Sequence, residues 1–90
     1  MIVWTEPARA DLNAIVDYIA TDNPAAAAQV LKRIRKQASV LKTHPEIGRR
    51  GRVPRTRELV VNRFPYTIVY TQTAQGVAIV RVLHQHQQWP

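Results

Sequence analysis

The chain has 90 residues, no cysteine and no apolar run near the roughly 18 residues of a membrane span, so disulfides, thiolate chemistry and a spanning helix are excluded. At this length we expect one domain, residues 1–90, and the lack of cysteine suits a reducing cytoplasm. The net charge of +7 is unevenly distributed, with −3 in residues 1–23 and +10 in residues 24–90. This favours a polyanionic or acidic partner over a basic surface kept only for solubility.

Two amphipathic helices are predicted in the first half of the chain. Ile2–Trp4 is predicted to form a short strand. Thr5 is then expected to cap a helix whose apolar stripe runs over residues 8–19. Asn23 is the expected N-cap of a second helix that begins at Pro24 and runs to about residue 43. The outer face of this second helix carries basic side chains and no acidic one, and the basic residues include Lys32, Arg33 and Lys36. The two helices are expected to form a hairpin.

The second half of the chain changes to the pattern of strands. Three runs rich in β-branched and aromatic residues are predicted as strands, namely Arg57–Asn62, Tyr66–Thr71 and Val77–His84. Turn residues separate them, so a three-stranded antiparallel meander is the economical arrangement. The predicted fold is therefore α+β in the order β-α-α-β-β-β, with the helical hairpin packed on one face of a small antiparallel sheet.

Residues 48–57, with the sequence GRRGRVPRTR, form what we call the arginine segment. It holds five arginines and no acid, and it is predicted to be a loop. Four of its side chains are candidates for binding a target or a nucleic acid, namely Arg49, Arg50, Arg52 and Arg55. We expect that Arg49, Arg50 and Arg52 can be replaced by alanine without disturbing the fold. The alternative is that the segment is only a solvated surface.

Most kinds of catalytic site are absent from the sequence. His84 and His86 share one face of a predicted strand, but no cysteine or carboxylate stands near them in sequence, so no metal site is expected. The chain has no recognisable Ser-His-Asp or Cys-His set and no phosphate-binding glycine-rich loop. We therefore expect neither a metal nor a cofactor.

RNA cleavage requires fewer specialised groups than these catalytic sites, and the sequence does not exclude it. It requires a base, an acid and cations that stabilise the phosphate, and the candidates here are Arg57, Arg81, His84 and His86. The alternative is that His84 is half-buried at a strand end and that His86 is merely exposed. Arg81 lies within an apolar strand and needs a partner, for which Glu58 is the structural candidate and a phosphate or acidic partner the functional one.

The ordered motifs HPEIGRRGRVPRTRELVV, PYTIVY and VAIVRVLHQHQQWP, with Asn23-Pro24 between the helices, resemble the RelE/ParE superfamily of type II toxin–antitoxin toxins. The resemblance covers nearly the whole chain. It implies a growth-inhibiting toxin that a small antitoxin, acidic or DNA-binding, holds inactive. Charge complementarity places an acidic segment of that antitoxin on Lys32, Arg33 and Lys36.

The resemblance implies one of two mechanisms. RelE-like members cut mRNA in the ribosomal A site with lysines and arginines on the strands, whereas ParE-like members poison DNA gyrase. Here Thr67, Val60 and Val61 stand where cationic residues of the ribonucleases are expected. The terminal aromatic residue is Trp89, which can stack on a base but cannot exchange protons. These departures favour gyrase inhibition; the alternatives are a ribosome-dependent ribonuclease and a basic nucleic-acid-binding module without toxicity.

Overall fold

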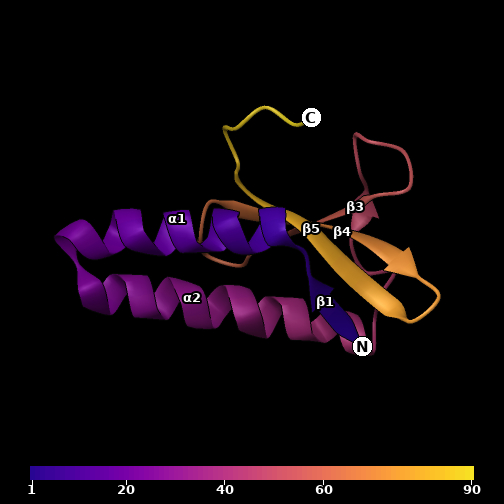
Figure 1. Cartoon of the computed structure of the whole chain (residues 1–90), viewed down its shortest axis with the longest axis horizontal. Coiled ribbons are helices and arrows are strands. Elements are labelled where there is room, and N and C mark those ends of the chain that lie inside the picture. The colour runs from indigo at the N-terminus through magenta and orange to yellow at the C-terminus, as the bar shows by residue number, and fades with distance from the viewer.

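Two antiparallel helices lie against a five-stranded mixed sheet in the computed structural model, which describes residues 1–90 (Figure 1). The helical elements are α1 (Glu6–Asp22), α2 (Pro24–Ser39) and the 3₁₀ turn η1 (Val40–Lys42). The strands are β1 (Ile2–Trp4), β2 (Arg49–Arg50), β3 (Arg57–Val60), β4 (Tyr66–Thr73) and β5 (Gly76–His84). The α+β class and the element order predicted from the sequence are confirmed, with one strand more than expected.

Both helices begin at the predicted capping residues. The side chain of Thr5 accepts a hydrogen bond from the amide of Ala8, and that of Asn23 accepts one from the amide of Ala26. The amide of Asn23 also donates to the carbonyl of Ile19, so one residue ends α1 and begins α2. This tight break places the helices side by side, and Figure 1 shows the closed end of the hairpin projecting beyond the sheet. Neither helix has the length and hydropathy that a bilayer-crossing segment requires.

The sheet has the order β1-β5-β4-β3-β2. The predicted antiparallel meander of β3, β4 and β5 is confirmed. The sheet is nevertheless mixed, because β1 pairs with β5 in parallel, as the crossover through the helical hairpin permits. The arginine segment is also not wholly a loop: Arg49 and Arg50 form β2, which pairs with Arg57 and Glu58 at the sheet edge. A strand of two residues is too short to show an alternating pattern.

The hydrophobic core lies between the hairpin and the sheet. It combines side chains from both layers, including Ala8, Leu12, Val30, Ile34, Leu41, Ile68, Tyr70, Ile79 and Val82. The two predicted helical stripes thus face the strands, which leaves the basic outer face of α2 exposed to solvent.

Tyr70 links this core to the start of the arginine segment. Its ring is fully buried, its hydroxyl accepts a hydrogen bond from the amide of Gly48 at 2.9 Å, and it donates one to the carbonyl of Pro45 at 2.7 Å. Burial raises the pKa of this phenol, which keeps it protonated and able to donate. A Cβ atom at Gly48 would lie 2.7 Å from the hydroxyl oxygen, so the chain must have glycine there.

We expect Tyr70→Phe to lower the free energy of unfolding by about 1–2 kcal/mol, because the buried Gly48 amide loses its only partner. Urea denaturation at neutral pH measures the change. Tyr18→Phe is the matched control: Tyr18 is 81% exposed, and its substitution is expected to change stability by less than about 0.5 kcal/mol. Equal effects of the two substitutions would contradict the role given to the Tyr70 hydroxyl.

Candidate functional site

The arginine segment is folded around a buried carboxylate. Glu58 is only 2% exposed and lies opposite Arg49 in the β2–β3 pair. Its Oε2 accepts hydrogen bonds from the amide and Nε of Arg52 at 3.0 and 3.2 Å, and its Oε1 accepts from Nη2 of Arg49 and of Arg52 at 3.2 and 3.3 Å. Burial alone would raise the pKa of Glu58, but the Arg52 amide and the two guanidinium groups outweigh it, so the pKa lies below 4.5.

Arg57 holds the start of the segment in a second way. Its Nη1 donates to the carbonyl of Gly48 at 2.8 Å and to that of Glu46 at 3.3 Å. Arg57 is therefore bound to the segment's own backbone, whereas sequence reasoning made it a candidate catalytic group.

The five arginines of the segment thus divide into two groups. Arg49, Arg52 and Arg57 make hydrogen bonds within the fold, whereas the exposed side chains of Arg50 and Arg55 make neither a hydrogen bond nor an ion pair. These contacts argue against the expectation that Arg49 and Arg52 can be removed without disturbing the fold, because the buried Glu58 carboxylate would lose its hydrogen-bond donors.

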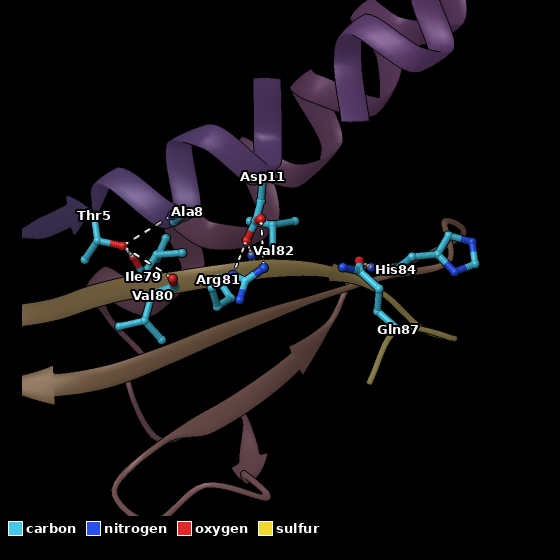
Figure 2. Close-up of polar contacts among 9 residues, drawn as sticks. All are labelled: Thr5, Ala8, Asp11, Ile79, Val80, Arg81, Val82, His84 and Gln87. Carbon is cyan, nitrogen blue, oxygen red and sulfur yellow. Dashed lines mark hydrogen bonds and ion pairs between the residues drawn. The ribbon is translucent and has the colours of Figure 1, made fainter. Parts of the chain in front are cut away.

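Arg81 forms a bidentate ion pair with Asp11 of α1 (Figure 2), so the prediction that Glu58 is its partner is wrong. Nε of Arg81 lies 2.6 Å from Asp11 Oδ2 and Nη2 lies 3.0 Å from Oδ1, while Oδ2 also accepts the Val82 amide at 3.0 Å. Strand β1 pairs with β5 only as far as Ile79, so Asp11 satisfies an edge amide that no strand reaches. The hydrogen bond to Asp11 raises the pKa of Arg81.

Sequence reasoning missed three residues that position this site, namely Asp11, Gly48 and Tyr70. The signal for Asp11 was its place in the helix: it lies three residues after Ala8 and next to Leu12, and so on the face that packs against the sheet. No comparable local pattern marks the contact between Tyr70 and Gly48, which are 22 residues apart.

The two candidate histidines lie together at the end of β5. Their ring centroids are 5.2 Å apart, and the ring of His84 meets that of Tyr66 edge-on at 5.7 Å. The backbone amide of His86 donates to Nδ1 of His84 at 3.2 Å. A neutral imidazole whose Nδ1 accepts a hydrogen bond carries its own proton on Nε2.

The four candidate catalytic residues are not brought together. In the sheet register Arg57 lies opposite Tyr70, whereas His84 lies opposite Tyr66, four residues further back along β4. That offset is roughly 13 Å along the strand. Figure 2 shows the imidazole of His84 pointing away from Arg81 and Asp11. Only His84 and His86 are direct neighbours.

A groove of about 520 Å³ does connect His84 with the arginine segment. It is lined by Arg49, Arg50, Arg52, Glu58, Val60, Thr67, Leu83, His84 and Gln85. Val60 and Thr67, two of the positions at which the ribonucleases are expected to be cationic, line it with neutral side chains.

Trp89, a predicted target-binding residue, lies against Arg81. The guanidinium carbon of Arg81 is 5.5 Å from the indole ring centroid, which is within the range of a cation–π contact. The indole Nε1 is buried and has no hydrogen-bond partner. The ring is therefore partly covered by the fold.

A second basic groove, the α2 groove, has a volume of about 440 Å³. It is lined by Gln29, Lys32, Arg33, Lys36, Arg63 and Phe64. The three predicted antitoxin-binding residues thus lie together, and the turn between β3 and β4 adds a cation and an aromatic ring that sequence reasoning did not include. Elsewhere, no three histidine, cysteine or acidic side chains are grouped so that they could hold a metal ion.

The architecture with these basic grooves is that of a toxin of a type II toxin–antitoxin system. A solved structure described as the chromosomal ParDE TA system from P. aeruginosa matches the fold with a TM-score of 0.82 and 29% identity, over 92% of each chain. The family model of the ParE toxin of the type II toxin-antitoxin system parDE matches residues 2–89. The chain belongs to this family.

Two relatives are similar along nearly their whole length. The Y4kP protein of Sinorhizobium fredii is 45% identical over 89 residues, which are 99% of this chain and 92% of the relative. Toxin RelE2 of Caulobacter vibrioides is 43% identical over 83 residues, which are 92% of each chain. The predicted membership of the RelE/ParE superfamily is confirmed.

We expect Glu58→Gln to lower the free energy of unfolding at pH 7 by roughly 2 kcal/mol, because charge-assisted hydrogen bonds are lost. The folded-state pKa of Glu58 lies below its ordinary value of 4.5. Its contribution is therefore complete above that value and is lost as the pH falls through the folded pKa. The variant should lose less stability than the wild type on acidification from neutral pH to below that folded pKa.

Urea denaturation at a series of pH values tests this prediction. Glu46→Gln, at an exposed carboxylate, is the control and should leave the pH profile nearly unchanged. Parallel profiles for the wild type and Glu58→Gln would contradict the role given to the buried charge.

Proposed function

We propose that this toxin inhibits DNA gyrase by binding, without cleaving RNA. The observation that carries the proposal is the state of the candidate catalytic groups. Arg81 is neutralised by Asp11, and Arg57 is bound to backbone carbonyls. The imidazole of His84 points away from Arg81 (Figure 2), and the sheet register separates His84 from Arg57. A set of groups held in this way supports a binding surface better than a catalytic centre.

The hydrogen bonding of His84 points in the same direction. A general base must offer a free lone pair to the 2′-hydroxyl of the RNA. Nδ1 of His84 already accepts the His86 amide, and the other nitrogen of the neutral ring carries the proton. His84 must give up this contact before it can act as a base.

A ribosome-dependent ribonuclease is the second candidate, and one observation favours it. His84 shares the groove of about 520 Å³ with Arg49, Arg50 and Arg52. Arginines beside a histidine are the groups that a phosphate in a cleavage reaction requires. The third candidate, a basic module without toxicity, has the weakest support, because the chain belongs to a toxin family.

We propose further that a cognate antitoxin binds the α2 groove. Lys32, Arg33, Lys36 and Arg63 supply positive charge there, and Phe64 supplies an apolar contact. This combination suits an acidic, amphipathic segment that orders as it binds. The similar P. aeruginosa structure, described as a ParDE TA system, supports a cognate antitoxin as a partner.

Purified toxin is expected to stop the supercoiling of relaxed plasmid by gyrase, to accumulate cleaved DNA and to leave mRNA on translating ribosomes intact. His84→Ala and His86→Ala should retain this inhibition, because neither imidazole takes part. If the protein is a ribonuclease, His84→Ala should reduce mRNA cleavage by about 100-fold or more. Discrete mRNA cuts that disappear in His84→Ala would contradict the gyrase proposal.

The double variant Arg33→Glu with Lys36→Glu is expected to slow association with the antitoxin by about 10-fold or more and to flatten its salt dependence, with a smaller effect on dissociation. Stopped-flow fluorescence measures both rates. The control is Arg35→Glu with Lys42→Glu, which makes the same charge change at residues that line a different groove beside Ile2 and Trp4. Equal effects of the two double variants would show that only net charge matters.

A further inference from the structure

We propose that Arg50, Arg55 and Arg57 form a binding site for the phosphodiester backbone of duplex DNA. This inference deepens the gyrase proposal and rests on it, because it assigns the DNA held by gyrase, rather than gyrase alone, as a ligand of the toxin. The site lies in the arginine segment, on a groove separate from the α2 groove that is assigned to the antitoxin.

The groove has a volume of about 680 Å³ and no acidic residue among those that line it. Arg50, Arg52, Arg55 and Arg57 contribute positive charge, and Thr71 and Gln72 of β4 add neutral polar side chains. The negative charge nearest in sequence, on Glu58, is buried and already bound by Arg49 and Arg52. An anion in the groove therefore meets guanidinium groups without an opposing carboxylate.

Two neighbouring strands place like charges opposite each other at this site. Arg50 of β2 is the direct register partner of Arg57 of β3. Like charges at opposed positions of an antiparallel pair destabilise the sheet. A phosphate bound between the two guanidinium groups removes this repulsion, and arginine provides the donors that a phosphate oxygen needs.

The backbone of Arg55 gives an independent indication. Its φ angle is +69°, in the left-handed region that glycine adopts without strain and that other residues disfavour. The hydroxyl of Thr71 donates to the Arg55 carbonyl at 2.7 Å and holds this conformation. An arginine at a position that suits glycine better is consistent with a role for its side chain, and that side chain is exposed.

The composition of the groove favours a nucleic acid over an acidic protein segment. Val53 and Pro54 are its only apolar side chains, and no aromatic ring lines it. Protein interfaces are enriched in aromatic residues at their centres, whereas interfaces with DNA are more polar and much more positive. The α2 groove is also basic, but it differs in that the aromatic ring of Phe64 lines it.

The first test measures binding of a fluorescent duplex of arbitrary sequence to the free toxin by anisotropy, over a series of salt concentrations. Arg50→Ala with Arg55→Ala is expected to weaken binding by about 10-fold or more at low salt. It should also reduce the slope of log affinity against log salt by about two, since each lost phosphate contact removes about 0.9.

Arg35→Ala with Lys42→Ala removes the same charge from another face and should leave both quantities nearly unchanged. An equal loss in this control would overturn the proposal, because only net charge would then matter. The proposal would also be overturned by tighter binding of single-stranded RNA than of the duplex, or by a double variant that loses antitoxin binding but keeps DNA binding.

The second test uses Arg55→Gly, which separates strain from function. The thermal midpoint of this variant should not fall, and a rise of up to about 5 °C is expected, because glycine relieves the left-handed conformation. Its affinity for duplex DNA should nevertheless fall several-fold. Unchanged affinity would overturn the proposal.

A supercoiling assay on the same proteins keeps the two proposals distinguishable. A toxin that inhibits gyrase but binds no duplex overturns the DNA site and leaves the gyrase proposal standing. A toxin that binds duplex through Arg50 and Arg55 but does not inhibit gyrase supports the DNA site and overturns the gyrase proposal.

Discussion

An ionised carboxylate that is withdrawn from water must be surrounded by donors, and Glu58 obtains four hydrogen bonds from Arg49 and Arg52. Because one of these donors is the backbone amide of Arg52, the carboxylate fixes the path of the chain as well as two side chains. The arginine segment is therefore closed against the sheet, although its composition resembles that of a solvated arm.

A similar arrangement occurs between α1 and β5. There, too, one acidic side chain binds both an arginine and a backbone amide. Asp11 binds the guanidinium of Arg81 and the amide of Val82, and so joins α1 to an edge of β5 that β1 does not cover. Two of the six acids thus stabilise the fold by holding arginines. The cations that remain unpaired, in the arginine segment and along α2, are the ones exposed to a partner.

Local signals predicted the elements, and long-range pairing explains what they missed. Thr5 and Asn23 could be recognised as caps because capping depends on neighbours in sequence. The partner of Arg81 could not, since it depends on the order of the strands and on the parallel pairing of β1. The residue types of the candidate site were predicted for the same local reasons. The sequence did not predict which of these arginines are held within the fold, because this depends on Glu58, which binds them across the edge of the sheet.

The parallel pairing of β1 with β5 has a consequence for the order of synthesis. Strand β1 pairs with β5 through Ile2 with Val77, Val3 with Ala78 and Trp4 with Ile79. The first strand to be synthesised therefore cannot pair until the last strand has been made. The Asp11–Arg81 pair spans a similar separation in sequence. Until β5 has left the ribosome, the nascent chain lacks the strand that joins β1 to β4, and the apolar stripes of both helices lack part of their cover. The sheet and the Asp11–Arg81 pair can therefore form only after β5 has been synthesised.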